Sequence, residues 1–274
     1  MKFVIAAALF ALAAAPLRAA SLDQVVSAAA RADVVILGEV HDNPAHHTYQ
    51  AQLVEMLQPS AVVWEMLTGV EAQMVDLALI PECDKLADQL GWAQSGWPDF
   101  AMYHPIFLAA PKARIFGAMV PRQEAKRAME GGVAAAFGAD AAAYGLTAPL
   151  PKAEQTSREE LQQLVHCNAL PPEMLAPMVE IQRLRDAALA RAVIDALQAT
   201  GGPVVVITGN GHARKDWGIP LYLKRVRPEV KVFAVGQSEN EQIAGEFDAV
   251  LDSKPVERDD PCDRFRAPTP EGVE

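Results

Sequence analysis

The sequence predicts an α/β protein in which a mainly parallel sheet is flanked by helices and carries an inserted helical subdomain. Three observations support this fold class. Short runs rich in β-branched residues recur along the chain, and they are apolar throughout instead of alternating, which is typical of strands covered on both faces. Helical patterns separate these runs, as expected for parallel strands. Between about residue 121 and residue 200 the patterns are helical only, which predicts the insertion.

The first twenty residues have the layout of a secretory signal peptide. Lys2 precedes an apolar run from Phe3 to Leu17, and small and polar residues follow. The run is too short to span a bilayer comfortably. We therefore expect residues 1–20 to be cleaved near Ala20 and the protein to be periplasmic or secreted, the alternative being an uncleaved N-terminal anchor. No cysteine follows the leader, so no lipoprotein anchor is expected.

A single α/β domain is expected over residues 21–255, because about 250 residues after cleavage suffice for one large domain. The apolar runs predict six strands, at residues 32–37, 61–64, 113–118, 203–208, 230–235 and 247–251. The tail over residues 256–274 is rich in Pro, Asp and Arg and is expected to be irregular.

The helices are marked by caps, prolines and apolar spacing. Asp42-Asn43-Pro44 supplies a cap and a proline at the start of a helix that runs to Leu57. Gln182 and Asp186 interrupt the apolar stripe of the longest predicted helix, and a polar pair on a buried face usually has a structural or functional role. Within the insertion we expect three helices, at residues 122–137, 157–167 and 172–199.

Charge and cysteine content limit the possible partners. The formal net charge of −11 becomes −13 when the leader, with Lys2 and Arg18, is removed. A protein this acidic repels nucleic acid, and no later segment is apolar for long enough to make it an integral membrane protein after cleavage.

The three cysteines are compatible with any one of three disulfide pairings, or with three unpaired thiols. We favour a disulfide between Cys167 and Cys262, because both flank the ends of predicted elements.

Polar motifs follow three of the predicted strands. The segment Gly38-Glu39-Val40-His41 follows the first strand, Gly209-Asn210-Gly211-His212 follows the fourth, and Glu65 follows the second. Because the carboxyl ends of parallel strands meet at one edge, we expect His41, Glu65 and His212 to lie together. Two imidazoles and a carboxylate suit a divalent transition metal with an open position for water. The alternative is that the histidines cap buried turns and the glutamate pairs with an arginine.

Several of these residues resemble a known family. The stretch from Gly38 to Pro44, continued by His46-His47 and Gln50, resembles the opening signature of the ChaN-like haem-binding proteins, which belong to the Tiki superfamily and are related to erythromycin esterases. The resemblance extends over residues 32–253. Three later groups agree with it: Val120-Pro121-Arg122 with Arg127, Gln182 with Arg185 and Asp186, and Gly209 to His212 with Gly218-Ile219-Pro220.

The resemblance implies a haem-binding protein of iron uptake and a homodimer with paired haems, each iron ligated by a tyrosine. Tyr144 is our first expectation for that ligand, because a helical flap can face a second subunit. Tyr103, in a loop-like segment, is the second. Arg122 or Arg127 is expected to supply a cation near the phenolate.

Other residues are expected to support the same site. His46 and Gln50 share a helix face, where they would hydrogen-bond a haem propionate or support His41; the alternative is a surface position. The resemblance also implies that further polar residues line the pocket, namely Gln182, Asp186 and Asn210.

Two classes of function follow. The first is a haem-binding protein without catalysis. The second is a metal-dependent hydrolase, in which His41, Glu65 and His212 hold the metal, its bound water is the nucleophile, and Glu39 is the general base. A third possibility is a periplasmic binding or assembly module that uses the same pocket for another ligand.

Overall fold

The computed structural model describes residues 19–260 and 262–263 of the 274-residue chain. The predicted signal peptide, apart from its last two residues, and residues 264–274 of the predicted tail lie outside the described residues. Within the described part, no helix is both long enough and apolar enough to cross a membrane.

The core is a six-stranded sheet in which every neighbouring pair is parallel, with strand order β3-β2-β4-β1-β5-β6. This confirms the predicted α/β class. Each strand overlaps the apolar run that predicts it, and β5 continues beyond its run because its second half pairs with β6 instead of β1. The strands are β1 (Val34–Leu37), β2 (Ala61–Trp64), β3 (Arg114–Gly117), β4 (Val204–Ile207), β5 (Val232–Glu239) and β6 (Ala249–Ser253).

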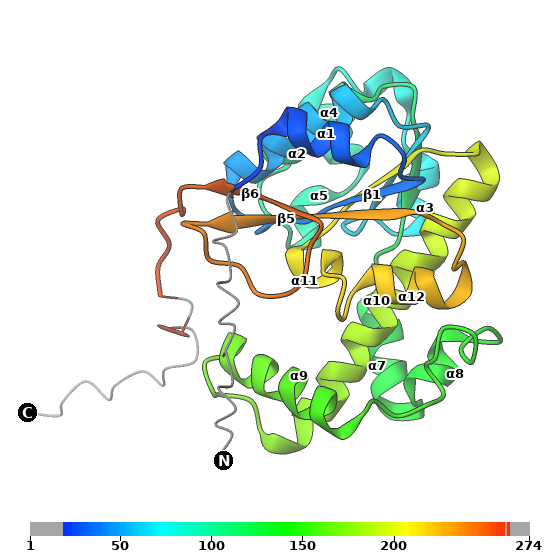
Figure 1. The fold of residues 1–274 in the computed structure, drawn as a ribbon, viewed down its shortest axis with the longest axis vertical. Helices are drawn as coiled ribbons and strands as arrows, with labels where there is room; N and C mark the ends of the chain where they lie inside the picture. The colour runs from blue at the N-terminus through cyan, green and yellow to red at the C-terminus, as the bar shows by residue number, and fades with distance from the viewer. Residues whose placement is uncertain (1–18, 261, 264–274) are drawn as a thin grey trace, which may run out of the picture.

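Helices cover both faces of the sheet, which explains why the strands are apolar throughout. Alternate residues of β1 belong to different cores: Val35 and Leu37 face one, Val34 and Ile36 the other. Figure 1 shows the sheet edge-on between its two helical layers. The first layer is made by α1 (Leu22–Ala29), α2 (Pro44–Leu57), α4 (Cys83–Gln89) and α6 (Phe100–Ala109), and the second by α10 (Pro172–Thr200), α11 (Asn210–Ala213) and α12 (Ile219–Val226).

Between β2 and β3 the chain forms helices that the sequence patterns do not predict. Tyr103, expected in a loop, lies in α6, which is capped by Asp99 and contains Pro105. The expectation of a loop is therefore wrong. The helix contains a proline, and its apolar residues lie all around its axis. The sequence therefore lacks the one-sided apolar spacing that predicts a helix. The shorter elements of this region are α3 (Gly69–Met74), η1 (Leu77–Leu79) and α5 (Trp92–Ser95).

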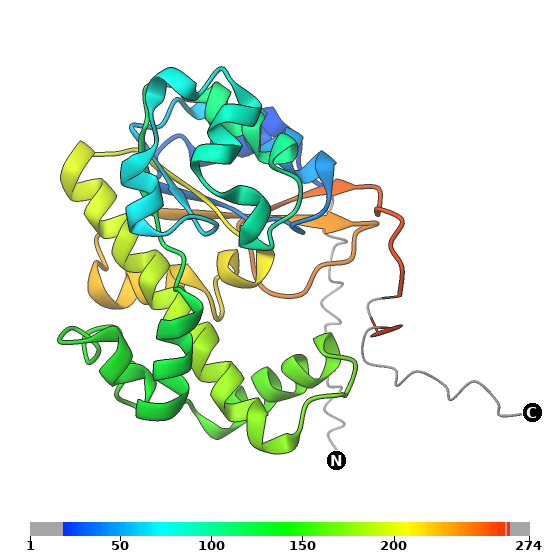
Figure 2. The same cartoon turned by 180° about the vertical axis from the view of Figure 1, so that it is seen from behind.

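The insertion before β4 is helical, as predicted, and stands away from the sheet together with the first half of α10 (Figures 1 and 2). The predicted helix 122–137 is two helices, because Gly132 adopts a φ of 88° that ends the first one. The predicted helix 157–167 begins and ends earlier than expected. The helices before α10 are α7 (Arg122–Gly131), α8 (Val133–Phe137) and α9 (Lys152–Val165).

The chain after β6 links the sheet to the insertion. Arg258 forms ion pairs with Asp42 and Glu239 at the carboxyl edge of the sheet. A disulfide then joins Cys262 to Cys167, just beyond the end of α9. This confirms the favoured pairing, and Cys83 is the unpaired cysteine. Residues 254–260 form neither helix nor strand.

Candidate functional site

The carboxyl ends of β1, β2 and β4 bring the predicted site residues to one edge of the sheet. Because Leu37 and Trp64 both pair with Ile207, the residues that follow these strands lie side by side. Gly209 allows the close approach of the loops. A Cβ at this position would lie 2.9 Å from His41 Nε2 and 3.8 Å from Glu65 Oε2. These two side chains therefore meet over a glycine that cannot be enlarged without displacing the His41 ring.

Glu39 is the buried centre of the first hydrogen-bonded group. Its Oε1 accepts a hydrogen bond from the Tyr103 hydroxyl at 3.0 Å and lies 2.7 Å from His41 Nδ1. Its Oε2 lies 3.4 Å from His47 Nδ1. The Glu39 side chain has no exposed surface, so it orients His41 and cannot contact a substrate. This placement argues against the predicted role of Glu39 as a general base.

His41 is the site histidine that remains accessible, with 34% of its side chain exposed. Its ring lies 4.9 Å from the ring of Trp97. Burial opposes a charge on the imidazole. The hydrogen bond to Glu39 and the negative charge of Glu65 outweigh burial, and together they raise the pKa of His41 to about 9. Nε2 of the resulting imidazolium is an available hydrogen-bond donor beside Glu65.

Glu65 and His212 form a second group with Asp186. Glu65 Oε2 accepts hydrogen bonds from Thr208 Oγ1 at 2.6 Å and from the Gly209 backbone N–H at 2.8 Å. Its Oε1 lies 3.5 Å from His212 Nε2, and His212 Nδ1 lies 2.6 Å from Asp186 Oδ1. One imidazole therefore bridges two buried carboxylates, an arrangement that we call the Glu65–His212–Asp186 bridge.

The bridge favours charged forms of Glu65 and His212. Burial opposes a charge on each of them. For Glu65, the positive charges of His212 and His41 outweigh burial and hold the pKa of the carboxyl below its usual range. For His212, the negative charges of Glu65 and Asp186 outweigh burial and raise the pKa of the ring.

His41 makes stability depend on pH. Its pKa rises from 6.5 to about 9 on folding, so its contribution is complete below pH 6.5 and is lost as the pH rises to about 9. The full shift corresponds to about 3 kcal/mol, and screening at the partly exposed ring reduces it to roughly 1–2 kcal/mol. Urea unfolding at pH 6 and pH 9 should show a smaller pH effect in His41→Gln than in the wild type. Equal pH effects in the two proteins would contradict the proposed charge on His41.

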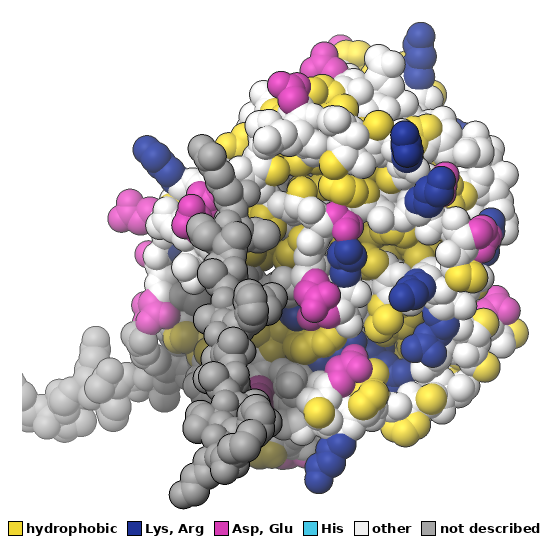
Figure 3. Space-filling model, viewed as in Figure 1, with side chains coloured by type: hydrophobic (Ala, Val, Ile, Leu, Met, Phe, Trp, Pro, Cys, Tyr) yellow, Lys and Arg dark blue, Asp and Glu magenta, His cyan; other side chains and the backbone are white. Residues whose placement is uncertain are grey.

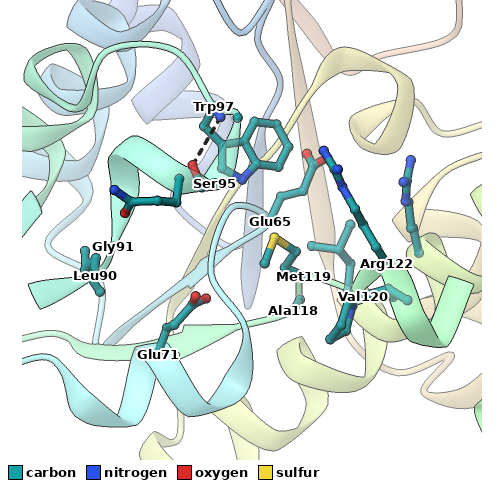
Figure 4. A pocket seen from close by; sticks show the side chains of 15 residues that line it. Glu65, Glu71, Leu90, Gly91, Ser95, Trp97, Ala118, Met119, Val120 and Arg122 are labelled. Carbon is teal, nitrogen blue, oxygen red and sulfur yellow. Dashed lines mark hydrogen bonds between the residues drawn. The ribbon is translucent and has the colours of Figure 1, made fainter. Parts of the chain in front are cut away.

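A cavity of about 590 Å³ opens beside this edge, and we call it the Trp97 cavity. Figure 4 shows Glu65, Trp97, Met119 and Arg122 around it. Arg122 and Arg185 line it without any ion pair to a described residue, and two carboxylates, Glu65 and Glu71, belong to the same lining. Much of the remaining lining is apolar: Leu90, Ala118, Val120, Pro121 and Leu189.

Several predicted site residues do not line the Trp97 cavity, because they are buried or hydrogen-bonded to other parts of the protein. His46 is buried, so its predicted contact with a haem propionate does not fit; its Nδ1 accepts a hydrogen bond from Val40 N–H. The alternative of a surface position for His46 and Gln50 is also wrong, because neither residue is exposed. The Asn210 side chain is held by the backbone of Gln237 and does not line the Trp97 cavity.

None of the four tyrosines, all of which are described, lines the Trp97 cavity. Tyr103 is fully buried, and burial together with the charge of Glu39 raises the pKa of its hydroxyl far above the usual range. Tyr144 is 5% exposed and packs against Phe137 and Arg191 in the insertion. These positions do not favour either tyrosine as an accessible haem ligand at this cavity.

The three predicted metal ligands converge, but the described residues contain no group of His, Cys, Asp or Glu arranged to hold a metal ion. Of the oxygens in this group, Glu65 Oε2 already accepts two hydrogen bonds within the protein. The predicted divalent metal site at His41, Glu65 and His212 is therefore not supported.

The patterns missed Trp97 and Met119, and they did not single out Arg185 as a site residue. Trp97 precedes α6 in a segment without periodicity, and Met119 follows β3 among apolar residues. Arg185 carried a usable signal, because it lies one residue before Asp186 and three after Gln182 in the polar interruption of α10. Its neighbour Gln182 lines a different cavity.

Comparisons with known proteins agree with this architecture. A family profile described as haem-binding uptake, Tiki superfamily, ChaN matches residues 25–223. A solved structure of Campylobacter jejuni ChaN with cofacial haem is similar, with a TM-score of 0.65 and 23% identity over 83% of this chain and 89% of that chain. The type III effector HopBA1 has a TM-score of 0.50 and 13% identity over 88% of this chain and 97% of that chain. These two structures show the likeness of the fold. No curated protein matches the sequence significantly.

Proposed function

Because this chain belongs to the ChaN family of haem-binding uptake proteins in the Tiki superfamily, we propose that it binds haem and that the Trp97 cavity is the binding site. The observation that carries the choice of site is the pair of arginines, Arg122 and Arg185, which make no ion pair with a described residue and line a partly apolar cavity. A porphyrin is apolar and planar, and its two propionates are anionic. The cavity offers a matching partner for each part.

The size and lining of the cavity fit such a ligand. Its volume of about 590 Å³ lies within the usual range for small-molecule and cofactor sites, about 300–1,000 Å³. Trp97 would stack against the ring system, and Met119 and Leu189 would pack against its edges. Arg122 and Arg185 would pair with the propionates, since guanidinium groups bind carboxylates with two parallel hydrogen bonds.

A side chain of this protein would hold the iron of bound haem. Met119 is the lining side chain whose sulfur is a known type of haem ligand, and the accessible ring of His41 adjoins the lining through Trp97. His41 would have to lose its proton to become a ligand, because its pKa is about 9. The spectrum of the complex distinguishes thioether, imidazole and tyrosinate ligation.

Haem titration followed in the Soret region tests the proposal. We expect saturable binding to the wild type and roughly tenfold weaker binding to Arg185→Met, since a hydrogen bond to a charged group contributes about 1.5–3 kcal/mol. Arg127→Met is the matched control, because Arg127 is an exposed arginine that pairs with Glu124 and does not line the cavity. No shift of the Soret band with the wild type would refute haem binding. Equal haem affinities of the two arginine variants would show that haem binds at another site.

We further propose that the protein is exported and periplasmic and that it forms a homodimer around haem, as the family resemblance implies. Size-exclusion chromatography of the mature protein with and without haem tests the dimer. Fractionation of cells that express the full chain tests export. A monomer at all haem ratios, or retention in the cytoplasm, would contradict the respective proposal.

A second candidate function is hydrolysis, which is favoured by His41 lying next to Glu65 beside the Trp97 cavity. Shifted pKa values in a cleft are typical of catalytic sites, and His41 would donate a proton to a leaving group. Glu39 would act as a positioning residue. A chromogenic carboxylic ester, offered with and without Zn²⁺, is a direct test. Turnover that His41→Gln abolishes would support hydrolysis, and no turnover under either condition would oppose it.

A further inference from the structure

A second cavity, of about 190 Å³, shares no lining residue with the Trp97 cavity. We call it the Trp217 cavity. It is enclosed by α9, by α10 and by the segment from α11 to Trp217, which precedes α12. Figure 3 shows apolar side chains gathered in the recess between the sheet and the insertion on this side of the molecule. Neither the proposed haem site nor the group around Glu39 uses this space.

One wall of the Trp217 cavity is an indole ring flanked by two cations. The guanidinium carbon of Arg214 lies 3.8 Å from the centre of the Trp217 ring, and that of Arg158 lies 5.0 Å from it. Each arginine has its own carboxylate partner, Asp216 for Arg214 and Glu154 for Arg158. The wall is therefore polarised but carries little net charge, so an anionic ligand gains little from it.

The unmet hydrogen-bonding capacity in the cavity belongs to two amides and to Nε of Arg158, a buried donor without a partner among the described residues. Gln162 is 8% exposed, and its Oε1 is fully buried without a hydrogen-bond partner. Gln182, half-buried on α10, makes no side-chain hydrogen bond to any described residue. A buried polar atom without a partner costs about 1–3 kcal/mol. A ligand that supplies both a donor and an acceptor would therefore satisfy these groups.

The remaining lining limits the ligand to a small molecule with a short aliphatic body. Leu161, Val165 and Val179 form the apolar part. The volume corresponds to about six water molecules at roughly 30 Å³ each. Asp186 also lines the cavity and disfavours a carboxylate there. A neutral amide matches all of these features, because its N–H₂ and C=O complement those of a glutamine side chain.

We propose that the Trp217 cavity is a second ligand site that binds a small neutral molecule through an amide group. Gln162 and Gln182 hydrogen-bond the amide, Trp217 forms the wall, and the aliphatic side chains of α9 and α10 contact the body of the ligand. The site shares no lining residue with the proposed haem site, so either proposal can fail without the other.

Ligand-observed NMR titration of the mature protein with isobutyramide tests this site, with isobutyrate as the charged analogue of the same shape. We expect saturable, millimolar binding of the amide and at least tenfold weaker binding of the carboxylate. Gln162→Leu should weaken amide binding at least tenfold, and Gln162→Glu, which keeps the size but loses the N–H₂ donors, should weaken it as well. Gln94→Leu is the matched control, because Gln94 lines the Trp97 cavity instead.

Three outcomes would overturn the proposal. Unchanged amide binding in Gln162→Leu would place the ligand elsewhere. Equal or tighter binding of isobutyrate would show recognition of charge. Absence of binding to the wild type at the highest soluble concentration would show a cavity that holds water only. Thermal unfolding of both Gln162 variants verifies that they are folded, and the haem titration of Gln162→Leu should match the wild type.

Discussion

Replacement of Glu65 by alanine is expected to lower the free energy of unfolding by about 3–5 kcal/mol, as when one partner of a buried ion pair is removed. The change would leave the hydroxyl of Thr208 and the N–H of Gly209 without their acceptor. It would also remove one of the two carboxylates that flank His212. Urea unfolding at pH 7, with its midpoint and slope, measures the loss.

Two variants make this result interpretable. Glu71→Ala removes a second carboxylate that lines the Trp97 cavity, but that group only completes the capping box of α3, so a loss of roughly 1 kcal/mol is expected. Glu65→Gln keeps the hydrogen-bond acceptor for Thr208 and loses the charge beside His212, so its loss should be intermediate. A loss in Glu65→Ala no larger than in Glu71→Ala would show that the bridge contributes little.

Removal of the Cys167–Cys262 disulfide is expected to lower the free energy of unfolding by about 3–5 kcal/mol. The bond joins residues 95 apart, and a crosslink that closes a loop of about 100 residues restricts the unfolded chain by about 4.7 kcal/mol in the chain-entropy description. Guanidinium unfolding of the double variant Cys167→Ser/Cys262→Ser, compared with the wild type, measures the effect.

Cys83→Ser is the control for that experiment, because Cys83 is unpaired and half-buried and its replacement should change stability by less than about 1 kcal/mol. Thiol titration of the oxidised wild type under denaturing conditions should detect a single thiol, and titration after reduction should detect three. Three thiols without reduction would show that the pairing does not form.

The strands were predictable because burial on both faces leaves continuous apolar runs, and each of the six was placed from such a run. The end of β5 was missed because it contains no such apolar run. Its last residues, Gln237, Ser238 and Glu239, are polar, and they remain in the sheet because they pair with β6. Ser238 also hydrogen-bonds Asp252 of that strand. An edge pairing of polar residues leaves no hydrophobic signature in the sequence.

The site was predictable where the sheet itself places the residues. Glu65, His41 and His212 follow strands that are neighbours in the sheet, so their convergence follows from the parallel topology. Tyr103 was not predictable in this way, because its hydrogen bond to Glu39 depends on how α6 packs against α2. The accessibility of a tyrosine is decided by its neighbours in space, and one sequence does not reveal them.

The Glu65–His212–Asp186 bridge has a thermodynamic consequence for the two cavities. Glu65 lines the Trp97 cavity and Asp186 lines the Trp217 cavity, so a single imidazole is shared between two otherwise separate compartments. A ligand that strengthens the hold of one carboxylate on His212 weakens the hold of the other. By thermodynamic reciprocity, the factor by which one bound ligand changes the affinity for the second equals the factor by which the second changes the affinity for the first.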